Sequence, residues 1–165
     1  DTLAGSLIAS HTNHTFTSEQ AVEVAKQLRR RGGVVDILAG DMFGARQVED
    51  SPDVTFTLFK EKLVDVISSD YIGGYHDPIL LVLQKAVEEK LLSIPEAVAL
   101  TTSSPAKIFP RLAYNKGLIE PGKVADICIV DRDDISKVRY VIIKGRVVVR
   151  EGRFDWTSHS QPSRF

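Results

Sequence analysis

The chain of 165 residues lacks several features that would each indicate a particular class of protein. It contains one cysteine, Cys128, so it has no disulfide framework, which favours a reducing compartment and a cytoplasmic location. No apolar stretch approaches the roughly 20 residues that a membrane-spanning helix needs. The 21 basic and 22 acidic residues nearly cancel, so the charge gives no reason to expect nucleic acid or a membrane as a partner.

The composition that remains is that of a globular protein. Hydrophobic residues make up 43% of the chain, which is enough to bury a sizeable core in one domain, or in one domain with a small appendage. Cys128 lies within the strand-like run 125–130. We therefore expect it to be a small buried core residue rather than a nucleophile.

Three short apolar runs each end on a polar side chain, and each is followed by a helical pattern. The runs and the polar residues after them are 7–10 with His11, 34–39 with Asp41, and 64–69 with Asp70. Parallel βα units present polar side chains in this order at their carboxyl-end face. The sequence therefore predicts an α/β fold with its chemistry at that face.

Local signals place helices between and after these strands. Thr17 with Gln20 forms a capping box that opens a helix over about 18–31, and Ser93 with Glu96 forms another. Proline at the first helical position marks three further starts. These are Ser51-Pro52, Asp77-Pro78 and Ser104-Pro105.

The pattern changes near Leu112. Three short strands are expected after it, at 125–130, 138–143 and 146–150, with a Lys144-Gly145 turn between the last two. They predict a small antiparallel β unit distinct from the βα part. We therefore divide the chain into residues 1–112 and 113–165.

His11 and Asp70 are the first candidates for chemistry. An imidazole and a carboxylate at the ends of parallel strands converge on one mouth, where they suit a divalent ion with an activated water. A neighbouring carboxylate such as Asp70 would then take a proton from that water and pass it to a leaving group. The alternatives are a hydrogen-bonded structural histidine at His11 and an aspartate that binds loop amides at Asp70.

Three further residues are candidates for binding a substrate: His14, Asp41 and His76. The two histidines lie in loops at the same predicted face, where the alternative is simple solvation. Asp41 lies between Gly40 and Met42, and its alternative is a role in loop structure.

One stretch of the sequence resembles a known family. Residues 117–131, Gly-Leu-Ile-Glu-Pro-Gly-Lys-Val-Ala-Asp-Ile-Cys-Ile-Val-Asp, are followed by Val-Ile-Ile-Lys-Gly-Arg-Val-Val at 141–148. This closely resembles the C-terminal signature of the amidohydrolase superfamily, which are metal-dependent hydrolases of the dihydroorotase, adenine deaminase and imidazolonepropionase kind. Residues 95–107 resemble the helix pair that the family places just before that signature. With the βα units, the resemblance covers nearly the whole chain.

The resemblance implies a fold and a function. The fold would be the C-terminal part of a (β/α)8 TIM-type barrel, followed by a small antiparallel β-sandwich portion. The function would be hydrolysis of a non-peptide C–N bond in a small amide, cyclic amide or amidine through a metal-activated water. The family has a metal-binding aspartate after its eighth strand, which matches Asp70, and often a histidine ligand after its sixth, which matches His11. The cofactor would be a divalent metal, with zinc first among the candidates.

The chain also departs from the family. The family's first-strand His-x-His pair, its lysine and its fifth-strand histidine have no counterpart here, and Asp1 has the look of an interior position. We therefore expect a partner beyond the small-molecule substrate, either further copies of the chain or a complementing N-terminal segment. Two alternatives stay open: a phosphoanhydride hydrolase of the phosphonate-breakdown type, which Ser69-Asp70-Tyr71 loosely resembles, and an inactive fragment that needs its N-terminal half.

Overall fold

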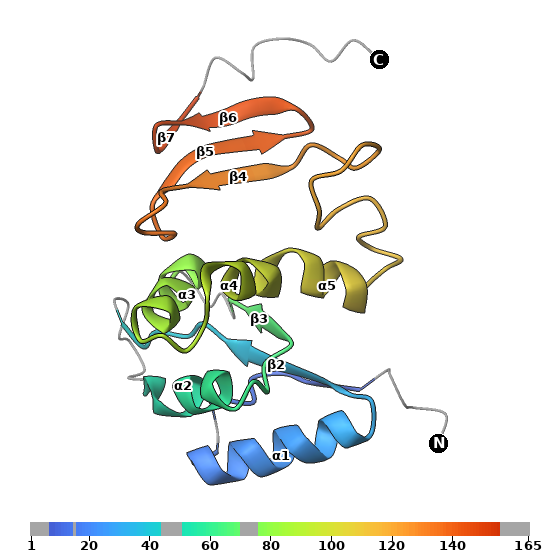
Figure 1. Cartoon of the computed structure of the whole chain (residues 1–165), viewed down its shortest axis with the longest axis vertical. Coiled ribbons are helices and arrows are strands. Elements are labelled where there is room, and N and C mark those ends of the chain that lie inside the picture. Colours follow the sequence, from blue (N-terminus) through green and yellow to red (C-terminus); the bar gives the residue numbers. More distant parts are fainter. Residues whose placement is uncertain (1–6, 15, 44–50, 70–75, 156–165) are drawn as a thin grey trace.

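The computed structural model describes residues 7–14, 16–43, 51–69 and 76–155. Two sheets lie at different places in the molecule. Figure 1 shows helices α1 and α2 at one end, helices α3 to α5 in the middle, and a four-stranded sheet at the other end. The bounds of the helices are α1 Ser18–Arg30, α2 Pro52–Lys60, α3 Ile79–Glu88, α4 Ile94–Thr101 and α5 Ser103–Ile108.

The first sheet is parallel, as the βα pattern predicts. Its strands are β1 (Ile8–Ala9), β2 (Val34–Leu38) and β3 (Val66–Ser68), in the order β1-β2-β3. Ile8 pairs with Val34, and Leu38 pairs with Ser68. Strands β1 and β3 are shorter than the apolar runs that predicted them, but the α/β class is confirmed.

Strand β2 is buried on both faces. Alternate residues Val35, Ile37 and Ala39 are fully buried in one cluster with side chains from α1, α2, α3 and α4. Because side chains alternate along a strand, Asp36 and Leu38 face the opposite side, and they too are nearly inaccessible. Double burial explains why this strand is apolar along almost its whole length.

The helices begin largely where the caps predict. Both capping boxes are present, with Thr17 and Gln20 at α1 and Ser93 and Glu96 at α4. Ser51 caps α2 through the N–H of Asp53.

The expected start at Asp77-Pro78 is wrong in one respect. Helix α3 has no side-chain cap, and Pro78 occupies the position before its first turn. The Asp77 carboxylate instead accepts a hydrogen bond from the N–H of Phe43, 34 positions earlier. A long-range partner has therefore replaced the local one.

The second sheet is antiparallel, with the order β4-β5-β6-β7. Its strands are β4 (Ile127–Val130), β5 (Val138–Ile143), β6 (Arg146–Arg150) and β7 (Arg153–Phe154). The bounds of β5 and β6 agree with the sequence. Lys144 and Gly145 between them both have positive φ, of 48° and 77°, as a two-residue hairpin turn requires. Strand β7 was not expected from the sequence.

A buried contact ties the segment between β4 and β5 to the helices. Ile135 is 2% exposed and belongs to the main hydrophobic cluster. Its N–H donates to the side-chain oxygen of Gln84 on α3 at 2.9 Å. Val130 packs against the same cluster. The antiparallel part is therefore anchored on α3.

The expectation that Cys128 is a buried core residue is wrong. Its side chain is exposed, and it lines a cavity whose other walls include residues of α4 and α5. Partial desolvation raises the pKa of the thiol. A raised pKa lowers the fraction of reactive thiolate near neutral pH.

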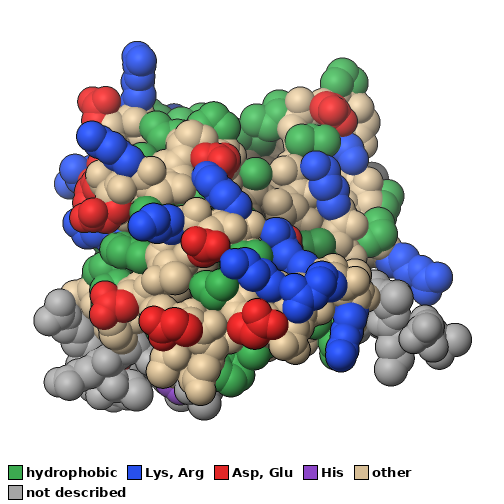
Figure 2. Space-filling view, turned by 60° about the horizontal axis from the view of Figure 1, so that its bottom comes forward, with side chains coloured by type: hydrophobic (Ala, Val, Ile, Leu, Met, Phe, Trp, Pro, Cys, Tyr) green, Lys and Arg blue, Asp and Glu red, His purple; other side chains and the backbone are tan. Residues whose placement is uncertain are grey.

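The surface mixes charges of both signs. Figure 2 shows acidic and basic side chains close to one another on the face it presents, as a formal net charge of −1 leads one to expect. Within the described ranges, no helix has both the length and the apolar character that crossing a bilayer would demand.

Candidate active site at the carboxyl edge of the parallel sheet

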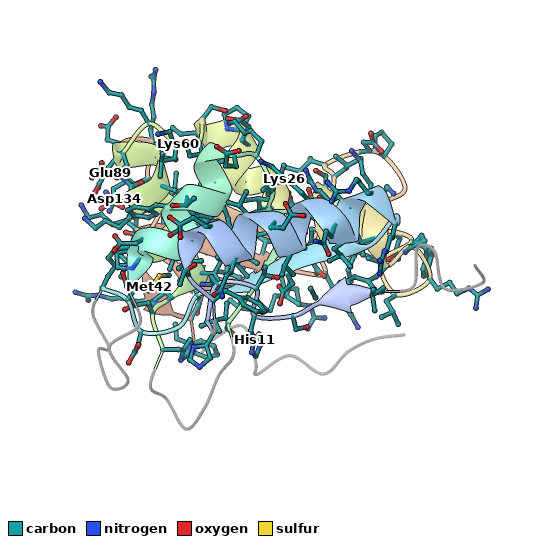
Figure 3. The ribbon with its side chains drawn as sticks, turned by 90° about the horizontal axis from the view of Figure 1, so that it is seen from below. His11, Lys26, Met42, Lys60, Glu89 and Asp134 are labelled. Carbon is teal, nitrogen blue, oxygen red and sulfur yellow. The ribbon has the colours of Figure 1, made fainter. Side chains whose placement is uncertain are left out.

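The parallel pairing of β1 and β2 brings two of the predicted site residues to one edge. His11 comes two residues after β1 ends, and Asp41 comes three residues after β2 ends. Since the two strands run in the same direction, the loops that follow them emerge side by side. Figure 3 labels His11 and Met42, the neighbour of Asp41, on the same side of helix α1 in that view. Asp70 lies outside the described residues.

His11 has an unusual backbone conformation. It is half-buried, and its φ of 58° lies in the left-handed region. Its carbonyl accepts a hydrogen bond from the N–H of His14 at 3.0 Å, which closes a tight turn. A non-glycine residue keeps this conformation only where its surroundings hold it there.

Hydrogen bonds of Thr12 and Asn13 keep His11 in this conformation. The N–H of Thr12 donates to the carbonyl of Asp36 on β2 at 3.1 Å, and its hydroxyl donates to the carbonyl of Ala9 at 3.0 Å. The Asn13 amide donates to the carbonyl of Leu38 at 3.0 Å and accepts from its N–H at 2.9 Å. The loop that carries His11 is thereby attached to strand β2.

Asp41 lies in a loop that is held from the other side. It is 2% exposed. The N–H of Asp77 donates to the carbonyl of Gly40 at 2.6 Å, and the Asp77 carboxylate accepts from the N–H of Phe43 at 2.5 Å. Asp77, itself 1% exposed, therefore fastens both ends of the segment around Asp41.

The two remaining histidines differ in position. His76 is half-buried and directly precedes Asp77, so it lies beside the loop after β2. His14 is exposed at the end of the turn that begins with His11. The contacts among the described residues thus link the segments of His11, Asp41 and His76 at one edge of the sheet.

Sequence reasoning missed three polar residues next to this edge. Asn13 lies in a loop with two histidines, where it resembles an ordinary loop residue. Asp77 precedes a proline, where the sequence suggested the start of a helix. Asp36 accepts a hydrogen bond from the hydroxyl of Ser68 at 2.9 Å. The sequence could have indicated this contact only through the presence of one aspartate within an otherwise apolar strand.

The donor types at this edge suit a divalent metal, but their number is small. Zinc takes imidazole nitrogen and carboxylate oxygen, from three or four protein ligands. Among the residues that the structure describes, no group of three or more His, Cys, Asp or Glu side chains is placed to hold a metal ion. His11 has a side chain of the right kind, but one imidazole is fewer than the three or four ligands that zinc takes.

A cavity lies elsewhere in the molecule. It has a volume of about 690 Å³ between α4, α5 and β4. Its lining is mostly apolar and includes Cys128, and Asp126 at its wall pairs with the Lys116 ammonium. Two of its lining residues, Asp126 and Cys128, have side chains of a metal-binding type, which is fewer than the three or four ligands that zinc takes.

At the opposite end of the strands, where β2 and β3 begin, charged side chains stabilise the fold. The Arg29 guanidinium binds both oxygens of the Asp65 carboxylate and also donates to the carbonyl of Lys62. Asp65 in turn accepts from the N–H of Val35 at 2.8 Å. These contacts secure the beginnings of β2 and β3, away from the ends that carry the candidate site.

A family comparison adds to this geometry. The model described as "Amidohydrolase family" matches residues 9–149, which span β1 to β6. The chain belongs to the amidohydrolase family. The resemblance drawn from residues 117–131 is confirmed.

Two amidohydrolase relatives show the range of names among similar sequences. A dihydroorotase of Lactobacillus gasseri is 38% identical over 61 residues, 37% of this chain and 14% of the relative. An imidazolonepropionase of Picrophilus torridus is 31% identical over 116 residues, 69% of this chain and 28% of the relative. The chain spans less than a third of the length of the curated relatives it matches.

Solved structures agree in fold. A β-aspartyl dipeptidase from Fervidobacterium islandicum AW-1 has a TM-score of 0.66 and 25% identity, over 92% of this chain and 42% of that chain. An adenosine deaminase from Xanthomonas campestris with bound zinc has a TM-score of 0.60 and 17% identity, over 93% of this chain and 39% of that chain. The second likeness is one of fold alone.

Proposed function

We propose that the protein carrying this chain is a metal-dependent amidohydrolase that cleaves a non-peptide C–N bond in a small molecule. One observation carries the proposal: parallel strands bring His11 and the Asp41 loop to a common edge, in a chain that matches the amidohydrolase family over residues 9–149. Asp70 follows β3, which is parallel to β2. The same geometry therefore favours Asp70 as a third contributor.

In this proposal His11 and Asp70 hold a divalent cation, with zinc first among the candidates. The zinc in the similar deaminase structure supports that choice. The cation would supply a water of lowered pKa. Asp70 would accept a proton from the attacking water and deliver it to the leaving nitrogen, while His11 contributes one imidazole nitrogen as a ligand.

The three candidates for substrate binding differ in how exposed their side chains are. His14 is exposed and His76 is half-buried, so both offer surface to a small molecule. Asp41 is 2% exposed, which favours a role in holding its loop over direct contact with substrate. The relatives' names supply the classes to try first, namely cyclic amides and β-aspartyl dipeptides.

The test uses the intact protein after metal removal and after zinc is restored. We would screen cyclic amides, β-aspartyl dipeptides and, as the competing class, nucleotide-like phosphoanhydrides. The proposal expects zinc-dependent hydrolysis of a C–N bond, with turnover reduced at least about 100-fold in Asp70→Asn. The exposed Asp133 gives the matched control Asp133→Asn, which is expected to retain activity.

Each contrary outcome has a definite meaning. Undiminished hydrolysis by Asp70→Asn would remove the proposed base. Cleavage of phosphoanhydrides with no activity on amides would replace the reaction class. The isolated 165 residues are expected to show no turnover, because His11 and Asp70 alone make too poor a cage for zinc.

A further inference from the structure

We infer that Asn13 is a positioning residue for His11, and that its side-chain amide sets the affinity of the candidate site for metal. The inference rests on the proposed function, since it takes His11 as a metal ligand. Nothing in the sequence distinguishes Asn13 from an ordinary loop asparagine between two histidines. Its role follows from four contacts with β2 and α2, three of them made by Asn13 and one by Thr12.

The first two contacts imitate a strand. Asn13 donates to the carbonyl of Leu38 and accepts from the N–H of the same residue. A peptide unit offers the same donor and acceptor pair. The side chain therefore continues the parallel pairing of β1 with β2 after the backbone of β1 has turned away.

The third contact reaches the helix layer. The Asn13 amide donates to the hydroxyl of Thr55 on α2 at 2.7 Å. Asn13 is 8% exposed and Thr55 is 0% exposed. A buried amide with these partners has little freedom, because losing any of them leaves a polar group unsatisfied.

The fourth contact completes the restraint next to His11. The N–H of Thr12 donates to the carbonyl of Asp36, so consecutive residues 12 and 13 are both attached to β2. His11 directly precedes them and has the left-handed φ of 58°. Its imidazole is thus carried on a turn whose other end is fixed to the sheet, which pre-orders it for a ligand.

The test compares two matched substitutions in the intact protein. Asn13→Leu replaces the buried amide by an apolar side chain of similar size. Gln84→Met makes the same kind of change on α3, where the Gln84 amide binds the N–H of Ile135. Zinc affinity is measured by competition with a chromogenic chelator, and hydrogen exchange at the amides of Thr12 and Leu38 is measured without metal.

The inference expects Asn13→Leu to weaken zinc binding by about 10-fold or more and to speed exchange at both amides. Gln84→Met should lower stability with zinc affinity within about twofold of the original protein. Thr55→Val keeps the bonds to Leu38 and removes one acceptor, so it should weaken zinc binding by a smaller factor, about threefold. If Asn13→Leu does not fold, Thr55→Val decides the question.

Three results would overturn the inference. The first is unchanged zinc affinity in folded Asn13→Leu, or in Thr55→Val where the former does not fold. The second is an equal loss of affinity in Gln84→Met, which would reflect general destabilisation. The third is undiminished zinc binding by His11→Ala, which would remove the ligand assignment itself. If His11→Ala loses zinc and Asn13→Leu does not, the proposed function stands and the positioning role alone fails.

Discussion

The carboxylate of Asp77 accepts a hydrogen bond from the N–H of Phe43 at 2.5 Å, while the N–H of Asp77 donates to the carbonyl of Gly40. One buried residue before α3 thereby fastens the loop that follows β2. The contact joins the segments of Asp41 and His76, two of the residues that the sequence put forward as candidates for substrate binding. It also explains why Asp77 does not cap α3.

Asp77→Ala should therefore destabilise the protein. The substitution leaves the N–H of Phe43 without its acceptor, and an unsatisfied buried donor costs about 1–3 kcal/mol in the free energy of unfolding. Urea denaturation measures the loss. The exposed Asp53 provides the control Asp53→Ala, expected to change stability by no more than about 0.5 kcal/mol. Equal effects of the two substitutions would contradict the role given to Asp77.

Ile135→Ala tests the anchor between the antiparallel sheet and the helices. Ile135 is 2% exposed within the main cluster, so truncation should cost about 2–5 kcal/mol through lost burial and the cavity left behind. Ile143 is 49% exposed at the end of β5. Ile143→Ala should cost clearly less, and an equal loss of stability would show that the segment before β5 is not anchored as described.

Glu96 gives a prediction in pH. The Lys62 ammonium, together with the N–H and hydroxyl of Ser93, lowers the pKa of Glu96 from 4.5 to about 2. Because the pKa is lower in the folded state, the stabilisation is fully present above pH 4.5 and is lost as the pH falls towards 2.

The stability difference between the original protein and Glu96→Gln should therefore shrink as the pH falls from 7 to 2.5. Chemical denaturation across that range measures it. Glu120→Gln, at an exposed position before β4, controls for general effects of acid. A difference that is the same at pH 7 and 2.5 would contradict the ionic role of Glu96.

Cys128 should be accessible but slow to react. Its thiol is exposed on β4, while desolvation raises its pKa, so less of the reactive thiolate is present near neutral pH. Alkylation by iodoacetamide at pH 7.5 should go to completion in the native protein, at a lower rate than in urea. A native rate above the denatured rate would indicate an activated cysteine instead.

Local chemistry accounts for the parts of the fold that sequence predicted well. The caps at Thr17 and Ser93 act within four residues, and the Lys144-Gly145 turn fixes the β5–β6 hairpin through its own backbone angles. The parallel order of the first three strands follows from the helices that connect them. Such signals are complete within a short window of sequence.

The features that sequence missed depend on distant partners. Asn13 bonds with Leu38 and Thr55, 25 and 42 positions away, and Asp77 bonds with Phe43 over 34 positions. Cys128 was expected in the core because its strand is apolar, yet its side chain is exposed and lines a cavity. The expected general base, Asp70, lies outside the described residues, so its role stays a prediction, as do the barrel and the β-sandwich portion.

The central claim is that His11 and Asp70 bind one divalent cation at the carboxyl edge of the parallel sheet. A crystal structure of the intact protein loaded with zinc, with anomalous diffraction at the zinc edge, tests it most directly. The account predicts a single anomalous peak with a His11 ring nitrogen and an Asp70 carboxylate oxygen each about 2.0–2.2 Å away. A zinc ion bound elsewhere, or an Asp70 side chain directed away from His11, would contradict it.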